Sequence, residues 1–259
     1  MHNLFAIINE TDHIVRIEFT NGKKYNPLSL DLIRALTKAL KEVSSQAKVK
    51  VLIISSEGPG FSAGHDLDEL RKNKNNKEFF KLLFNECSIL MQTIMTLPQP
   101  VIAEVSGIAA AAGCQLVASC DLAVASEQAS FMTPGVNIGL FCSTPMVAVS
   151  RNISRKKIME MLLTGEKINS QDAVQFGLIN HSVPREQLRN KTMNLAKLIA
   201  SKPSSTVKIG KEAFYRQVEM PINEAYNYTS EVMTANMMEI DAQEGINAFL
   251  DKRNPNWNE

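Results

Sequence analysis

The sequence predicts an α/β fold in which parallel strands are covered by helices and are followed by a region made only of helices. Short apolar runs alternate with helical periodicity as far as Val183. Beyond that residue strand signals nearly vanish, and the rest of the chain carries helical patterns alone. Alternation of strand and helix is typical of parallel sheets with helices outside them.

Six short apolar runs have the length and the β-branched content of strands. These runs are Phe5–Ile8, Ile14–Phe19, Val49–Ile54, Val101–Val105, Leu122–Ala125 and Ile179–Val183. Two helical stripes lie between them, with apolar residues three and four positions apart over residues 32–47 and 80–94. The second stripe ends before Pro98 and Pro100, which break a helix and lead into the next strand.

Four helical stretches make up the C-terminal part of the chain. They are Gln187–Ser201, Ser205–Gln217, Ile222–Met238 and Asp241–Asp251. Met233, Met237 and Met238 are suited to pack in a core or against a neighbouring subunit. We therefore expect a core over residues 1–195 and a helical region over residues 196–259.

The composition is that of a globular protein with a sizeable core. Of the 259 residues, 44% are hydrophobic and 21% are charged. The formal net charge of +1 gives no electrostatic footprint of nucleic-acid or membrane binding. The basic run Arg71–Lys77 has no interleaved aromatic residues, so we expect a solvated loop there.

The N-terminal sequence MHNLFAIINE lacks the features of a secretory signal or a transit peptide. No apolar run approaches the ~18–20 residues that span a bilayer. We expect a cytoplasmic protein, or one of the mitochondrial matrix if a presequence has been removed. The cysteines Cys87, Cys114, Cys120 and Cys142 form no CxxC pair, which favours reduced, buried thiols and no metal site.

A first turn whose backbone could bind a ligand lies in the segment Pro59–Leu70, PGFSAGHDLDEL. Gly64 allows the backbone to turn sharply and leaves the amide of His65 pointing outward. A helix is expected to begin at Asp66, which together with Glu69 fits a capping box. Both carboxylates are therefore assigned structural roles.

A second turn lies in the segment Val101–Cys120, where a strand runs into Gly107 and small residues open a helix around Gly113. Small residues let a ligand approach the backbone, and free amides at a helix N-terminus carry partial positive charge. Alanine and glycine could equally serve close packing between helix and strand. Two such turns in one chain are more specific than either alone.

Together these segments resemble the signature segments of the crotonase (enoyl-CoA hydratase/isomerase) superfamily. The resemblance is carried by FSAGHDLDEL and GIAAAAGCQLVASCDLAVASEQASFMTP, and it extends from NPLSLDLIRALTKAL to EGINAFLDKRNPNW. GCQLVASCD and GLFCSTP match one subgroup within it. The resemblance implies a ClpP-like spiral of ββα units with a helical C-terminal trimerisation region, as a homotrimer or as a homohexamer built from two trimers.

The resemblance further implies an acyl-CoA thioester as partner, bound through the backbone amides of His65 and Ala112. Such preorganised donors stabilise an oxyanion or enolate and are worth ~10²–10³ each in rate. The residues implied to contact coenzyme A are Lys23, Ala63, Gly64, His65, Asp66, Leu67, Asp68, Ala112, Phe249 and Lys252. For the two lysines a solvated surface position is an equally good interpretation. Coenzyme A belongs to the substrate, and no separate cofactor is implied.

The family pattern fails at the two catalytic carboxylates. Hydratases of this family carry one glutamate after the GGGC-like turn and another in a PE dipeptide about twenty residues later. Here these positions hold Gln115 and Gly135. An amide orients water but cannot exchange a proton near neutral pH. General acid–base catalysis supplies ~10²–10⁴ per group, so hydration by the usual mechanism is expected to be weak or absent.

Other side chains near the turns offer alternatives. Cys142 could act as a nucleophile or proton donor if a partner lowered its pKa, although a buried thiol is the stronger interpretation. Ser143 lies by position where hydratases offer a backbone amide to water. Asp121 is expected to cap or pair inside the fold, Glu127 to face solvent, and Glu104 has no clear role.

Three functions remain open from the sequence. The first is a crotonase-family enzyme with other chemistry, such as thioester hydrolysis, decarboxylation or an unusual isomerisation. The second is a non-catalytic acyl-CoA binder, and the third is a hydratase of low activity. All three use the same pocket and the same pair of backbone donors.

Overall fold

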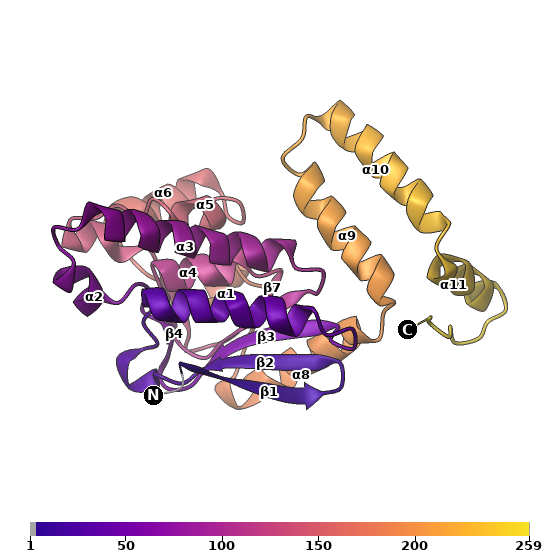
Figure 1. Ribbon diagram of the computed structural model, residues 1–259, viewed down its shortest axis with the longest axis horizontal. Coiled ribbons are helices and arrows are strands. Elements are labelled where there is room, and N and C mark those ends of the chain that lie inside the picture. The colour runs from indigo at the N-terminus through magenta and orange to yellow at the C-terminus, as the bar shows by residue number, and fades with distance from the viewer. Residues whose placement is uncertain (1–3, 259) are drawn as a thin grey trace.

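The computed structural model describes residues 4–258 and arranges them as two sheets wrapped by helices, with further helices standing to one side (Figure 1). The strands are β1 Phe5–Thr11, β2 Ile14–Phe19, β3 Val51–Ser56, β4 Gly60–Ser62, β5 Val101–Val105, β6 Ile108–Ala110, β7 Leu122–Ser126, β8 Ser130–Met132, β9 Ile168–Asn169 and β10 His181–Val183.

The helices of the core are α1 Leu30–Ser44, α2 Leu67–Lys72, α3 Lys77–Thr96, α4 Ala112–Ser119, α5 Pro145–Val149, α6 Arg155–Thr164, α7 Ser170–Phe176 and α8 Leu188–Ala200. Short 3₁₀ helices are η1 Gly22–Lys24, η2 Pro134–Ile138 and η3 Arg185–Gln187. The chain ends in α9 Ser204–Gln217, α10 Ile222–Met237 and α11 Ile240–Leu250.

From β3 to β8, successive strands alternate between the two sheets, which makes the core a spiral. The larger sheet has the order β1-β2-β3-β5-β7-β10, and the smaller has the order β4-β6-β8-β9. The pairs β3/β4, β5/β6 and β7/β8 each send one strand to each sheet, and helices follow them. Pairing is parallel except between β1 and β2 and between β8 and β9. The predicted spiral of ββα units is therefore present.

The two faces of the larger sheet are covered by different helices. On β2, Val15 and Ile17 belong to the main core beneath α1 and α3, whereas Ile14 belongs to a smaller core beneath α8. The alternation follows from the two-residue period of a strand. Arg16 also faces the smaller core, where its guanidinium pairs with Glu104 at 2.7 Å and 3.1 Å. Glu104 thus has the structural role that its sequence did not reveal.

Most predicted elements are confirmed, and the errors lie where elements are short. β2 and β5 have the expected bounds, and α8 to α11 differ from the expected helices by one residue at their ends. The strands of the smaller sheet were not predicted. Ala47 was expected in a helix but lies exposed beyond the end of α1. The run Arg71–Lys77 is a loop only at residues 73–76, because its first residues end α2 and Lys77 begins α3.

The last three helices form what we call the C-terminal arm, residues 204–258. In Figure 1 the arm stands apart from the sheets, with α9 beside α10 and α11 at the far end. The boundary expected at residue 195 falls inside α8, which packs on the larger sheet. None of the helices in residues 4–258 combines the length and apolar character that a membrane span requires.

Candidate active site

The two turns singled out from the sequence meet in space. β4 leads into the first turn and pairs with β6, which leads into the second. Gly64 has a φ of +89°, and a Cβ atom there would lie 3.0 Å from the Ala110 carbonyl oxygen and 3.2 Å from the Ala112 nitrogen. Gly113 is equally tight, because its Cβ would lie 2.5 Å from the Ser62 carbonyl oxygen. Glycine at both positions lets the two backbones touch.

Ala111 holds the second turn in a strained conformation. Its φ is +48° and its ψ is −116°, a region that residues with a side chain rarely adopt. Its N–H donates to the Met132 carbonyl at 3.0 Å. The next residue, Ala112, begins α4, so its N–H has no acceptor within the helix. The strain therefore directs a free helix amide toward the first turn.

The amide of His65 is also available. Leu28 donates to the Gly64 carbonyl at 2.8 Å, which fixes the peptide before His65. Within residues 4–258, neither His65 nor Ala112 donates its amide to another backbone or side-chain group. Two adjacent donors without acceptors, one of them at a helix N-terminus, suit a carbonyl oxygen that gains negative charge.

The imidazole of His65 packs inside the fold and does not face solvent. Its ring meets Phe84 edge-on with centroids 5.4 Å apart, and Nδ1 lies 3.3 Å from the Leu28 carbonyl oxygen. Nε2 is buried and has no hydrogen-bond partner among the residues that the structure describes. Burial lowers the pKa of His65, so the ring is neutral near pH 7.

A polar network that the sequence did not reveal braces the first turn. Asn26 is fully buried at φ +48°, and its Nδ2 donates to the Glu57 and Gly60 carbonyls at 3.0 Å and 2.9 Å. Ser62 donates its hydroxyl to the Asn26 carbonyl at 2.9 Å and accepts from the Gly64 amide at 3.2 Å. The Asn-Pro pair at residues 26–27 is a turn signal that could have pointed to this bracing.

The predicted capping box after the first turn is half right. Asp66 caps α2, since its Oδ1 accepts from the amides of Asp68 and Glu69 at 2.9 Å and 3.2 Å. Glu69 does not reach back to Asp66 but accepts from the Leu30 amide at 3.1 Å, and burial raises its pKa. It therefore ties α2 to the start of α1.

The two positions that lack a catalytic carboxylate differ in the space available for a side chain. Gln115 lies on α4 one turn after Ala112 and is 4% exposed, and its buried Oε1 has no hydrogen-bond partner within residues 4–258. Gly135 lies in η2, and a Cβ there would be 2.7 Å from the Leu140 carbonyl oxygen and 2.9 Å from Cys142 Sγ. The space for a side chain at residue 135 is thus already filled.

Cys142 fills that space as an acceptor. The Gly135 amide donates to its Sγ at 3.3 Å, and burial raises the pKa of the thiol. The four cysteines are free and buried, as expected. Ser143 is exposed, and its amide donates to the Phe141 carbonyl at 2.7 Å. The amide that the sequence suggested for a water molecule is therefore already engaged within the loop.

The residues implied for coenzyme A fall into two groups. Lys23 lies in η1, and the following Tyr25 accepts from the Ala63 amide at 2.8 Å, which sets η1 beside the first turn. Leu67 and Asp68 are exposed, with Asp68 paired to Arg71 at 2.8 Å. Phe249 lies in the last turn of α11 and Lys252 follows that helix, on the C-terminal arm that stands apart from the sheets in Figure 1.

A cavity of about 770 Å³ lies between α3, α4, α5 and α9, and Gln115 is one of the residues that line it. Its apolar lining comes from Met91, Met95, Ala118, Val147, Ala148, Phe214 and Val218. Asp121 also lines it, pairs with Lys211 at 2.6 Å and accepts from the Tyr215 hydroxyl at 3.0 Å. Asp121 thus pairs inside the fold, while Glu127 is exposed, as expected for both.

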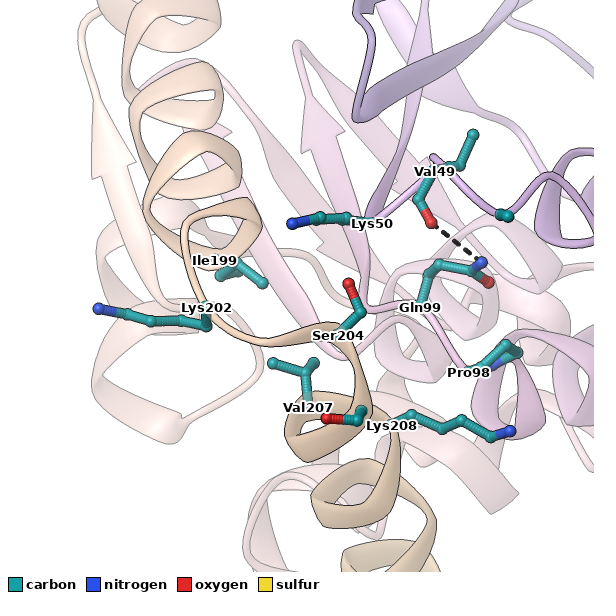
Figure 2. Close-up of a pocket in the computed structure, with 11 residues that line it drawn as sticks. Val49, Lys50, Pro98, Gln99, Ile199, Lys202, Ser204, Val207 and Lys208 are labelled. Carbon is teal, nitrogen blue, oxygen red and sulfur yellow. Dashed lines mark hydrogen bonds between the residues drawn. The ribbon is translucent and has the colours of Figure 1, made fainter. Parts of the chain in front are cut away.

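A second pocket lies at the junction of the core with the N-terminus of α9, and Figure 2 shows it. Lys50, Lys202 and Lys208 surround it, and Gln99 donates to the Val49 carbonyl at 3.1 Å on its wall. The pocket contains none of the candidate site residues, so it is separate from the two turns.

The chain matches the family model described as enoyl-CoA hydratase/isomerase over residues 9–259. It is similar to the mitochondrial enoyl-CoA hydratase domain-containing protein 3 of Homo sapiens, with 48% identity over 96% of this chain and 82% of that protein. The Xenopus laevis protein of the same name is 46% identical over 99% of this chain and 87% of its own length. The subgroup indicated by GCQLVASCD and GLFCSTP is the one to which these relatives belong.

Solved structures agree with the sequence relatives. The human enoyl coenzyme A hydratase domain-containing protein 3 superposes with a TM-score of 0.95 at 46% identity, over 98% of this chain and all of that one. An enoyl-CoA hydratase of Mycobacterium smegmatis superposes with a TM-score of 0.96 at 42% identity, over 99% of both chains. These likenesses confirm the predicted crotonase-type fold.

Proposed function

Because the chain belongs to the enoyl-CoA hydratase/isomerase family, we propose that it binds an acyl-CoA thioester with the carbonyl oxygen on the amides of His65 and Ala112. The supporting observation is the meeting of these two donors at Gly64 and Ala111. Donors fixed in place before the reaction favour the charged oxyanion or enolate over the neutral carbonyl. Coenzyme A enters as part of the substrate, without a separate cofactor.

Ordinary hydration is not the activity we propose. It needs one group to activate water and another to protonate the α-carbon, and the two positions hold Gln115 and Gly135. Loss of two acid–base groups at ~10²–10⁴ each leaves binding and oxyanion stabilisation. The protein is therefore either an acyl-CoA binder or an enzyme of another crotonase chemistry.

The observations favour binding over covalent chemistry at the GLFCSTP loop. Cys142 accepts from Gly135 and has a raised pKa because of burial, so it carries little thiolate. Ser143 is exposed, and its hydroxyl contacts only the Phe141 carbonyl at 3.4 Å among the described residues. Among residues 4–258, no basic side chain forms a hydrogen bond with either group, so neither is activated as a nucleophile.

The test is a pair of measurements on the same preparation. Binding of butyryl-CoA and free coenzyme A is followed by calorimetry, and hydration of crotonyl-CoA by loss of the enoyl thioester absorbance. We expect the thioester to bind and hydration to remain near background. Absence of any thioester binding would refute the binding function, and turnover comparable to a hydratase would refute the requirement for both carboxyls.

The proposed assembly is a homotrimer or a homohexamer formed through the C-terminal arm. Its support is the number of large apolar side chains that the arm exposes, among them Ile222, Tyr226, Met233, Met238 and Phe249. Light scattering after size-exclusion chromatography measures the state directly. We propose a cytoplasmic location, with mitochondria as the alternative because the vertebrate relatives are named as mitochondrial proteins.

A further inference from the structure

We propose that the last residues of the chain act as a strap that holds α11 against the joint between α8 and α9. The strap is residues 253–258, and the joint is residues 201–203. Asp241, near the start of α11, is the residue to which the strap is fastened. All these contacts lie within one chain, so the strap does not depend on the proposed binding of acyl-CoA.

The three helices of the C-terminal arm bury few of their own side chains. Their buried residues are Ala213 of α9, Ala225 of α10, and Asp241 and Ala248 of α11. On α11, the large apolar side chains of Ile240 and Leu250 are 68% and 71% exposed. Helices in proteins are held mainly by the packing of an apolar face. Other contacts must therefore keep α11 in its place.

The anchor that joins α9 to the core does not reach α11. Nζ of Lys211 on α9 donates to the carbonyls of Ile94 and Gln99 at 2.9 Å each and to Asp121 at 2.6 Å. α10 and α11 follow after the turn at residues 218–221, and they pack mainly on α9 and on each other. Figure 1 shows both helices standing apart from the sheets. The position of α11 therefore needs a second anchor.

The chain returns to the joint after α11. In Figure 1 the end of the chain lies near the base of α9. Nε1 of Trp257 donates to the carbonyl of Ser201, the residue that follows α8, at 3.0 Å. A Cβ atom on Gly245 of α11 would lie 3.4 Å from the Trp257 ring, so the ring also packs on that helix. Trp257 thus contacts the joint and α11 at the same time.

Asp241 joins three parts of the chain through one carboxylate. It is the second residue of α11 and is 6% exposed. Its Oδ1 accepts from the Asn258 amide at 2.7 Å, and its Oδ2 accepts from the Ser205 hydroxyl at 2.8 Å. A buried carboxylate is costly without hydrogen bonds, and the N-terminus of a helix favours its charge. Both oxygens are therefore engaged, one by the strap and one by the start of α9.

A second carboxylate turns the chain back toward the joint. Arg253 donates to the two oxygens of Glu244 at 2.7 Å and 2.8 Å, and the Asn256 amide donates to Oε1 at 2.6 Å. Lys252 precedes this turn with a φ of +55°, the left-handed conformation that often ends a helix. The Arg253 and Glu244 side chains are partly exposed, so solvent competes with their pairing. They direct the strap, and the buried Asp241 fastens it.

The strap makes α11 a part of the molecule that can open locally. Without the hydrogen bonds of Asp241 and Trp257, α11 keeps mainly its contacts with α9 and α10. Elements with few buried contacts open at a lower free energy than the core. Loss of the strap should therefore release α11 while the sheets and the Lys211 anchor stay formed.

The experiment follows hydrogen exchange by mass spectrometry and the fluorescence of Trp257, the one tryptophan of the chain. Asp241→Ala should speed exchange in α11 at least about tenfold, because two hydrogen bonds to a buried charged group are lost. Exchange in β3 and β5 should not change. The emission of Trp257 should shift to longer wavelength, and acrylamide should quench it more strongly. Asp241→Asn keeps two polar atoms at this position and should stay closer to wild type.

Glu231→Ala is the matched control, because Glu231 is an exposed carboxylate on α10 of the same arm. Its exchange and emission should equal those of wild type. Should Asp241→Ala fail to fold, Trp257→Phe removes the indole donor but keeps an aromatic ring, and it should speed exchange in α11 and in residues 201–206. Unchanged exchange of α11 in a folded variant, or equal acceleration in α11 and β5, would overturn the strap.

Discussion

The two turns that carry the His65 and Ala112 amides differ from the positions of Gln115 and Gly135 in what builds them. The turns depend on backbone geometry, namely the φ of +89° at Gly64 and of +48° at Ala111. The function of the second pair of positions would depend on side chains. There Gln115 carries an amide and Gly135 has only a hydrogen atom. Binding and acid–base catalysis are therefore separable within one site.

The difference also shows in how each region is packed. Around the turns, glycines at residues 64 and 113 keep the space that close approach of the backbones requires. Around Gly135 the equivalent space is occupied by Cys142 and by the Leu140 carbonyl. In the first region glycine lets two backbones touch, whereas in the second the space beside the glycine is filled by the loop that follows it. The following variants test whether this contrast is real.

The largest effect is expected for Gly113→Ala, which attacks the contact between the turns. The added Cβ would lie 2.5 Å from the Ser62 carbonyl oxygen and 2.8 Å from Ser62 Cβ, so α4 must move away from β4. We expect a loss of about 1–3 kcal/mol in the free energy of unfolding, as for other overpacked sites. Thioester affinity should fall by at least about tenfold, since the donors act only when aligned.

Gly210→Ala on α9 is the control for this change. A Cβ at Gly210 meets nothing within 4 Å, so alanine there should be neutral or stabilise the helix by up to about 1 kcal/mol. Urea unfolding and calorimetry measure both quantities for both variants. Equal behaviour of the two variants would show that the turns do not depend on close approach.

The next effect is expected for Gly135→Glu, which restores a carboxylate to the closed region. Its Cβ would collide with the Leu140 carbonyl oxygen and Cys142 Sγ, so we expect a loss of about 1–2 kcal/mol. Gly135→Ala carries the same collision without the carboxylate and should lose a similar amount. Crotonyl-CoA hydration should stay at background even when Gln115→Glu is added. Recovered hydration would show that the loop opens more easily than its packing suggests.

An element could be predicted from the sequence where its own residues are numerous enough to show a pattern. The apolar runs of β2 and β5 specified those strands, and the helices of the arm differed from expectation by single residues. Strands of two or three residues, such as Gly60–Ser62 and Ile168–Asn169, are too short to display a period of two. The smaller sheet was therefore missed, although the turns at its strand ends were recognised.

Contacts between distant residues set the other limit. The absence of the glutamates at Gln115 and Gly135 was visible in the sequence, but the filling of that space by Cys142 was not. Asp121 was expected to pair inside the fold, yet nothing in the sequence named Lys211, ninety residues away, as its partner. The direction in which the arm leaves the core is likewise decided by such contacts rather than by any local pattern.

A smaller effect is expected from pH at the first turn. Because burial lowers the pKa of His65, the unfolded chain takes up a proton more readily than the folded one. Stability should therefore be full above the unfolded value of about 6.5 and decline as pH falls through it toward the lower folded value, by at most about 1.4 kcal/mol per pH unit. His65→Gln cannot titrate and should flatten the decline.

His181 contributes to the same decline, since burial and Lys191 lower its pKa as well. The quantity to measure is therefore the difference in unfolding free energy between wild type and His65→Gln at pH 7 and at pH 5. Thioester affinity of the variant at pH 7.5 should stay within about threefold of wild type, because the backbone amide is retained. A large loss of affinity would assign the imidazole a part in binding.

The smallest effect is expected for Cys142→Ser. This variant tests whether the thiol only fills the space beside Gly135 or also reacts with a substrate. Serine keeps an acceptor for the Gly135 amide, so stability should change by less than about 1 kcal/mol. The same thiol should react slowly with iodoacetamide at pH 8, because burial raises its pKa and little thiolate forms. Any turnover found on an acyl-CoA should survive the substitution. Loss of that turnover with intact stability would make the sulfur a reacting atom, and the closed region would then be a second place where chemistry occurs.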